Sequence, residues 1–346
     1  MTFQIALLLA QDGVVSGAIY ALLAAALVLV FSVTRVIFIP QGEFVAYGAL
    51  TLAALQAGRT PGTLWLLAAV GAAVATVDGI GAVRTGAPGR LPRVLAGSLG
   101  PPAALAALLA VVRPAALPIW VQVPLALALV VPLGPGLYRL VYEPLAGASV
   151  LVLLIVSVAL HLALVNVGLL SFGAEGVRTT PFSEARLSLG PLPVSGQSLW
   201  VIGFSVALFA ALSLFFGRTT LGKALRASAM NRTGARLVGI RPALMGRWCF
   251  GLAALVGAFS GVLVAPITTI YYDNGFLIGL KGFVGAIVGA LASYPVAAAG
   301  ALLVGLVESF ASFEASAYKE AIVFGLIIPV LVWRSLRAHG VEEEDA

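Results

Sequence analysis

The chain is built from long apolar runs separated by short polar segments, and this pattern constrains its fold more than any other feature. A helix needs about 20 apolar residues to cross the hydrocarbon core of a bilayer, because each residue adds about 1.5 Å. The chain is 61% hydrophobic and 10% charged, so it has far more apolar and far fewer charged residues than a soluble domain. The sequence therefore predicts an all-α polytopic membrane protein.

Eleven apolar runs are candidate membrane spans, with boundaries that also allow nine or ten. They cover residues 13–33, 43–56, 64–80, 94–112, 119–137, 150–172, 199–216, 248–267, 276–294, 296–310 and 321–333. The N-terminal segment lacks the basic residues that begin a cleaved signal peptide, so we expect the first span to be retained. We expect residues 1–346 to form a single transmembrane domain.

The distribution of basic residues predicts the orientation of the chain. If the N-terminus is outside and the spans alternate, fourteen of the twenty Lys and Arg residues fall on the inner side. Since short loops rich in Lys and Arg stay in the cytosol, we expect an external N-terminus and a cytosolic C-terminus. The same loops explain the net charge of +6, so we expect no nucleic acid partner.

Residues 218–247 form a polar segment between two apolar runs, with seven basic residues and no acidic one. Thr219 or Thr220 can cap a first short helix at its N-terminus. Thr233 can cap a second helix, which Gly239 can end. We therefore expect a structured helix pair in the cytosol that binds a soluble partner. The alternative is a basic loop that serves only to orient the chain.

Two further segments stand out on the expected outer side. Residues 173–198 alternate apolar and polar side chains around Gly190 and Pro191, which predicts a short hairpin or a surface helix. Residues 270–282 place Tyr, Asp, Asn and Lys side chains in a Gly-rich apolar region, where charge is avoided unless it faces water or a cavity. The glycines that follow predict short helices, which membrane proteins tolerate where they are buried or line a path.

Four sequence blocks, in this order, resemble the membrane permease subunits of branched-chain amino acid ABC importers, a family that includes permeases for urea and amides. The blocks are TRVIFIPQGEFVAYGAL at 34–50, YEPLAGAS at 142–149, RTTLGKALRASAMNRTGARLVGI at 218–240, and GFLIGLKGFVGAIVGALASYPVAAAGALLVGLVES with SAYKEAIVF at 275–324. The resemblance covers 13–50 and 138–334. It implies ATP-driven import of branched-chain or other amino acids, or of related small polar solutes, across the cytoplasmic membrane of a bacterium or archaeon.

The resemblance also implies the partners. They are a second permease subunit, either a homologue or a copy of this chain, two ATP-binding subunits and an extracytoplasmic solute-binding protein. ATP and Mg would be held by the ATP-binding subunits, because the chain has no GxxxxGK[ST] motif. We expect no cofactor on this chain and no enzymatic activity of its own. Cys249 and two histidines provide too few ligands for a Cys- or His-based metal cluster.

In this family a short cytosolic helix of each permease fits a groove of an ATPase, and residues 221–240 match that segment. Small residues there permit close approach, and basic residues could pair with an acidic rim on the partner. The ATPase-coupling candidates are Gly222, Lys223, Ala224, Arg226, Ala227, Asn231, Arg232 and Gly239.

A second group of residues is expected beside the translocation path. The candidates are Gln41, Gly42, Glu43, His161, Asn166, Lys281, Gly285 and Gly289. Each has a structural alternative. Glu43 could cap the second span at its positive end, and His161 could serve packing alone. Asn166 could form an interhelical hydrogen bond, and Lys281 could reach the outer interface. The two later glycines would keep the path narrow through close helix approach.

The chain departs from the family pattern at several places, and these leave the substrate open. Gln41 stands where the family commonly has His, and Glu143 stands where it has Arg. His161 and Asn166 lie in a stretch where a glycine, a small polar residue and a Gln-Asn pair are frequent. Residues 61–118 are longer than usual by about two spans, and we interpret them as an inserted helix pair outside the resemblance.

Two other classes of function remain to be weighed. A secondary transporter or channel that acts without an ATPase fits the composition equally well, but it would not need the helix pair of residues 218–247. An intramembrane enzyme would need a catalytic constellation, and the sequence contains no HExxH motif, paired intramembrane aspartates or nucleophile elbow. The sequence therefore favours a permease subunit.

Overall fold

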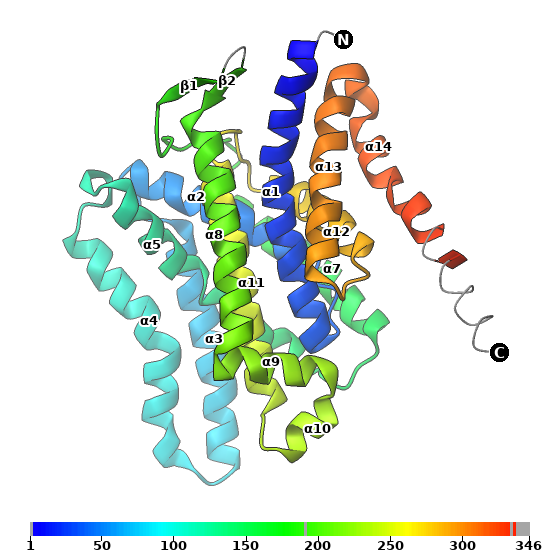
Figure 1. The fold of residues 1–346 in the computed structure, drawn as a ribbon. Helices are drawn as coiled ribbons and strands as arrows, with labels where there is room; N and C mark the ends of the chain where they lie inside the picture. Colours follow the sequence, from blue (N-terminus) through cyan, green and yellow to red (C-terminus); the bar gives the residue numbers. More distant parts are fainter. Residues whose placement is uncertain (1–2, 190–191, 333–334, 337–346) are drawn as a thin grey trace, which may run out of the picture.

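The computed structural model describes residues 3–189, 192–332 and 335–336, and helices dominate the fold (Figure 1). The long helices are α1 (Phe3–Thr34), α3 (Gly62–Arg84), α4 (Leu91–Val111), α7 (Val150–Phe172), α8 (Gly196–Arg218), α11 (Pro242–Val264) and α13 (Tyr294–Glu314). A further apolar stretch is built from α5 (Ile119–Val130), α6 (Leu133–Leu137) and the π-helical turn η3 (Tyr138–Tyr142). Shorter helices are α2 (Gln41–Gln56), α9 (Thr220–Met230), α10 (Arg232–Leu237), α12 (Asn274–Val288) and α14 (Lys319–Gly325). Single turns are η1 (Pro88–Arg90), η2 (Pro114–Ala116) and η4 (Ser316–Tyr318).

Eight stretches of the described chain are long and apolar enough to cross a membrane, which fits the predicted polytopic fold. The count of eleven is not reached. Two of the expected spans correspond to α2 and α12, whose lengths of 16 and 15 residues are too short for a full crossing. The expected span 321–333 begins in α14 and includes residues outside the described part of the chain. Residues 337–346, with the expected cytosolic C-terminus, lie outside the described residues.

Helix α1 forms the centre of the bundle and α4 lies at its edge. In its most apolar stretch, 83% of the residues of α1 are buried within the chain, against 6% for the span that contains α4. Helix α1 packs on α11, α12 and α13, and α2 packs on α5, α11 and α12. The core therefore consists of α1 and α2 with the C-terminal helices around them.

Helix α2 begins in the interior because the segment before it is buried. Val36 and Phe38 are 2% and 0% exposed, and α2 starts three residues after Phe38. Non-helical backbone is tolerated at membrane depth where protein surrounds it. A Cβ at Gly42 would overlap the backbone of Gly275, so α2 and α12 touch at backbone distance. This contact explains why both short helices can be buried.

The segment 61–118 forms a helical hairpin of α3 and α4 at the edge of the bundle (Figure 1). Helix α4 makes its contacts mainly with α3, which in turn reaches α6 and α7. That this hairpin is an insertion relative to other permeases stays a prediction.

The expected hairpin in residues 173–198 is present. Strands β1 (Arg186–Leu189) and β2 (Leu192–Ser195) pair antiparallel, with Arg186 opposite Ser195. Gly190 and Pro191, around which the turn was predicted, lie outside the described residues. Figure 1 places this hairpin at the opposite end of the molecule from α9 and α10.

Candidate functional site

The polar segment 218–247 folds into the predicted helix pair. Thr219 caps α9, since its Oγ1 accepts a hydrogen bond from the Gly222 backbone N–H at 3.0 Å. The prediction that Thr233 caps the second helix was wrong. Asn231 caps α10 instead, with its Oδ1 2.8 Å from the Gly234 nitrogen. Gly239 ends the pair with a φ of +87°, a left-handed conformation that favours glycine.

One face of the helix pair is anchored to the membrane bundle. Leu225 and Ser228 are buried, and α9 packs on α1, α8 and α11. Arg232 donates from Nε to the Val33 carbonyl at 3.2 Å, which ties α10 to the end of α1. A Cβ at Gly222 would lie 2.7 Å from the Phe216 Cα, so this glycine lets α9 approach the end of α8. Its small size serves packing within the chain.

The other face of the helix pair is exposed and carries both apolar and basic side chains. Met230, Leu237 and Val238 are 87%, 84% and 77% exposed. The coupling candidates Lys223, Arg226, Asn231 and Gly239 are exposed, whereas Ala224, Ala227 and Arg232 are partly buried. Our sequence reasoning missed the three large apolar residues. No clear signal in the sequence marks them, because the same segment contains other large apolar residues, such as Leu225, that are buried.

A second candidate region lies where α2, α7 and α12 meet. The Glu43 side chain is fully buried, and its Oε1 lies 2.9 Å from Nδ1 of His161 on α7. The His161 ring stacks on Phe276 of α12 at a centroid distance of 4.5 Å. Glu43 lies in the first turn of α2 as expected, but no side chain caps that helix. Glu43 therefore forms a hydrogen bond to another helix and no capping hydrogen bond in its own helix.

The first turn of α2 holds two more path candidates. Gln41 is fully buried and donates from Nε2 to the Ala253 carbonyl of α11 at 2.9 Å. Its Oε1 and the Glu43 Oε2 are buried without a hydrogen-bond partner among the described residues. A cavity of about 10 Å³ beside Phe38, Phe276 and Gly279 has room for about one water molecule, so a solute would need the helices to move.

Lys281 belongs to a buried ionic cluster. Its Nζ lies 2.6 Å from Glu308 Oε1 and 3.2 Å from Glu320 Oε1, and the side chain is 7% exposed. The Tyr20 hydroxyl donates to the other Glu308 oxygen at 2.5 Å. Two carboxylates of this chain therefore hold the Lys281 ammonium group, and whether it also borders the path or the outer interface stays a prediction. The cluster borders a cavity of about 330 Å³ that also touches Asn274.

The remaining path candidates lie elsewhere. Asn166 is exposed and donates to the Leu162 carbonyl of its own helix at 2.7 Å, so the expected interhelical bond is replaced by an intrahelical one. Gly285 faces α13, since a Cβ there would lie 2.6 Å from the Ala301 Cβ. Gly289 likewise contacts α13 at Ala297. The structure thus brings Gln41, Gly42, Glu43 and His161 together and places the other four candidates apart.

A second ionic network involves Glu143, which we noted as a departure from the family. Glu143 accepts from Arg139 Nη1 at 2.9 Å and from Arg247 Nε at 2.8 Å. Arg139 also donates from Nε to Asp78 of α3 at 2.8 Å. The network joins α3, η3 and α11 near the end that carries α9 and α10. Sequence reasoning did not find it, because its members are far apart in the chain.

Comparisons with known proteins place the chain among membrane permeases. The family described as branched-chain amino acid transport system, permease component, matches residues 94–331. The chain is 30% identical over 209 residues to the high-affinity branched-chain amino acid transport system permease protein BraD of Pseudomonas aeruginosa, covering 58% of this chain and 68% of the relative. It is 27% identical over 208 residues to the corresponding permease protein LivH of Escherichia coli K12, covering 58% and 67%. No solved structure matches the chain.

Proposed function

The chain belongs to the family of branched-chain amino acid transport permease components, and from this premise we propose that it is the membrane subunit of an ATP-driven ABC importer. Its multi-pass fold and its relatives agree with a place in the inner membrane. The source of the proposed importer is a bacterium or archaeon. The cargo is a branched-chain or other amino acid, or a related small polar solute. The relatives named for branched-chain amino acid transport support this substrate class.

The exposed face of α9 and α10 carries the proposal. Large apolar side chains on a surface outside the membrane mark a contact with another protein. Met230, Leu237 and Val238 would enter an apolar groove, and the neighbouring Lys223 and Arg226 would meet an acidic rim. The buried face fixes the helix pair to α1, α8 and α11. A movement of α9 and α10 caused by a docked ATP-binding subunit would therefore be transmitted directly to α1, α8 and α11.

The partners follow from this arrangement. Two separate ATP-binding subunits would hold ATP and Mg and would dock on the helix pair of each permease. A second permease, a homologue or a copy, completes the membrane part. With α9 and α10 in the cytosol, the β1–β2 hairpin faces outward, where a solute-binding protein would deliver the cargo (Figure 1). This orientation places the N-terminus outside and agrees with the distribution of basic residues.

The solute path is proposed to pass the first turn of α2. Gln41 and Glu43 each bury an oxygen without a partner among the described residues, and polar groups inside a membrane bundle mark pathways. His161 and Phe276 on α7 and α12 border the same turn. A relative movement of these three helices would enlarge the cavity of about 10 Å³ beside them.

The proposed docking surface, the exposed face of α9 and α10, is tested by replacing one of its apolar side chains with a charged one. Leu237→Glu should remove the ATP-binding subunits from the purified complex and abolish ATP-dependent uptake into proteoliposomes. Leu187→Glu is the matched control, because Leu187 is also exposed but lies in β1 at the opposite end. It should keep the ATP-binding subunits bound. Equal retention in both variants would rule out α9 and α10 as the docking site.

The alternative of a secondary transporter or channel makes a different prediction. The purified chain alone, without ATP-binding subunits, would then move solute down its gradient in proteoliposomes. We expect no such flux and no uptake until the ATP-binding subunits and Mg-ATP are added. Flux through the chain alone would overturn the proposed coupling.

A further inference from the structure

A pocket lies between the α3–α4 hairpin and the rest of the bundle, away from the proposed path. Its volume is about 370 Å³, within the range of small-molecule sites. Helices α3 and α4 form one wall, and α6 and α11 contribute to the other. Most of its length is lined by apolar side chains such as Leu67, Val70, Val74 and Pro101. Such a wall fits a hydrocarbon chain better than a polar solute.

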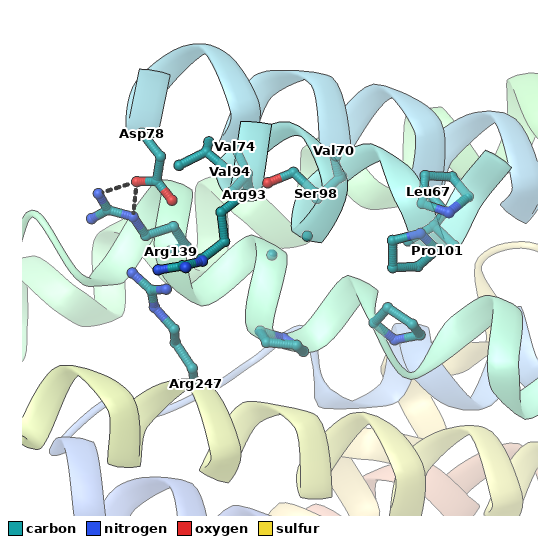
Figure 2. A pocket seen from close by; sticks show the side chains of 16 residues that line it. Leu67, Val70, Val74, Asp78, Arg93, Val94, Ser98, Pro101, Arg139 and Arg247 are labelled. Carbon is teal, nitrogen blue, oxygen red and sulfur yellow. Dashed lines mark hydrogen bonds and ion pairs between the residues drawn. The ribbon is translucent and has the colours of Figure 1, made fainter. Parts of the chain in front are cut away.

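One end of the pocket is basic. Figure 2 shows Arg93, Arg139 and Arg247 directed to the same end, with Leu67 and Pro101 at the other. Arg139 is neutralised by Asp78, to which it donates from Nε at 2.8 Å. Arg247 donates from Nε and Nη2 to Glu143, which leaves its Nη1 without a partner among the described residues.

Arg93 supplies the excess charge. It is exposed and forms no ion pair with a described residue. Three guanidinium groups thus meet two carboxylates, those of Asp78 and Glu143, and one positive charge remains. A phosphate group is the natural complement, because guanidinium donors match its oxygens and can bind two at once.

The length of the pocket matches one leaflet of a bilayer. Its wall along α3 runs from Asp78 to Leu67, eleven residues apart, which is about 16 Å at 1.5 Å per residue. Half of the hydrocarbon core is about 15 Å thick. The basic end lies at the same end of the molecule as α9 and α10, so in the orientation proposed above it faces the cytosolic leaflet (Figure 1).

We propose that this pocket binds one anionic phospholipid, with the phosphate at Arg93 and Arg247 and an acyl chain along α3. Basic pockets between transmembrane helices on the cytosolic side are suited to such headgroups. The bound lipid would fill the space between the α3–α4 hairpin and the core. It would thereby support α4, whose own contacts within the chain are few. The site is independent of the solute path and of the docking surface.

The first test compares lipids on the purified chain in detergent by native mass spectrometry. Dioleoyl phosphatidylglycerol should bind more tightly than dioleoyl phosphatidylcholine, which has the same acyl chains and no net charge. Arg93→Gln should weaken phosphatidylglycerol binding about fivefold. Arg90→Gln should leave it unchanged, because Arg90 is exposed in the same hairpin but does not line the pocket.

The second test fills the apolar part of the pocket. Gly97 lines the pocket, and a Cβ there meets nothing within 4 Å, so Gly97→Leu adds bulk at a position where the first side-chain atom has room. It should displace phosphatidylglycerol from the chain. Gly81→Leu is the matched control, since Gly81 is equally open but lies outside the pocket. Thermal unfolding of each variant shows whether the fold is kept.

Several results would overturn the proposal. If Arg93→Gln and Arg90→Gln weakened phosphatidylglycerol binding equally, the lipid would be held by unspecific charge attraction. Binding of glycerol 3-phosphate as tightly as phosphatidylglycerol would identify a soluble anion as the ligand. A dimer that dissociates with Gly97→Leu while phosphatidylglycerol stays bound would assign the pocket to a contact between copies of the chain. Lipid retention in both glycine variants would likewise exclude the pocket as the lipid site.

Discussion

Glu43 and His161 are 118 residues apart in the chain, yet the Glu43 carboxylate lies 2.9 Å from the His161 Nδ1 in the interior of the bundle. His161 is halfway along α7, which is long and apolar enough to cross a membrane, so the pair lies near the middle of that candidate span. Phe276 stacks on the same ring and brings α12 to the pair. A polar contact thus joins α2 to α7, and a ring stack joins α7 to α12. This contact is where we propose that the solute passes, because polar groups inside a membrane bundle are rare and mark pathways.

Removal of His161 should destabilise the protein. In His161→Ala the fully buried Glu43 side chain loses its hydrogen-bond partner, and leaving a buried polar group unpaired costs about 1–3 kcal/mol. The double variant Glu43→Gln with His161→Ala should recover much of this stability, because a neutral amide is less costly to bury. Thermal unfolding in detergent measures both. Equal stability of the two variants would show that the pair makes no ionic contribution.

The same variant should change the solutes that pass. We expect His161→Ala to alter uptake across a panel of branched-chain, polar and aromatic solutes more than it alters ATP hydrolysis by the complex, since α9 packs on α1, α8 and α11 and not mainly on α7. The measurement is uptake into proteoliposomes together with ATPase activity. An unchanged solute profile with lowered stability would assign His161 to packing alone.

Gly42 should tolerate no side chain. A Cβ there would overlap the Gly275 backbone, so Gly42→Ala must push α2 away from α12, at a cost of about 3 kcal/mol. Gly81→Ala is the control, because its Cβ meets nothing within 4 Å; it should raise stability by up to about 1 kcal/mol through helix propensity. Unfolding temperatures of the two variants should therefore shift in opposite directions. Equal shifts would contradict the close contact of α2 and α12.

Much of the fold could be predicted from local patterns. The apolar runs located the long helices, and Thr219 and Gly239 were found because caps and helix ends depend on neighbouring residues. The second cap was missed because Asn231 and Thr233 are both good caps, and the choice depends on where α9 ends. The span count failed for α2 and α12. Burial in protein, which a sequence pattern does not show, removes the need for a full membrane length.

The candidate site was predicted less well, since its contacts join distant parts of the chain. Lys281 could be recognised as an unusual charge, but its partners Glu308 and Glu320 belong to α13 and α14. Gly285 was expected to border the path, and its contact with Ala301 instead suits the packing of α12 on α13. The spacing of glycines along a helix indicates that another helix approaches closely, but it does not show which helix that is. The tertiary structure is needed to decide whether a residue borders the path or only packs against a neighbouring helix.

The orientation of the chain gives the last prediction. Cysteines introduced at Glu184 and at Thr233, in a Cys249→Ser background, should react with a membrane-impermeant maleimide from opposite sides. Both positions are exposed, one just before the β1–β2 hairpin and one in α10, and these elements lie at opposite ends of the molecule (Figure 1). Ser228 would be a poor choice for the inner label, because it is 1% exposed.

In intact cells only the Glu184→Cys variant should be labelled. The Thr233→Cys variant should react after the membrane is opened, because the basic segment around it stays in the cytosol. Cys249 itself is buried, so the parent chain should give little background. Labelling of both variants in intact cells would place α9 and α10 outside, where no ATP-binding subunit could reach them. That result would contradict the proposed orientation and, with it, the proposed coupling role of the helix pair.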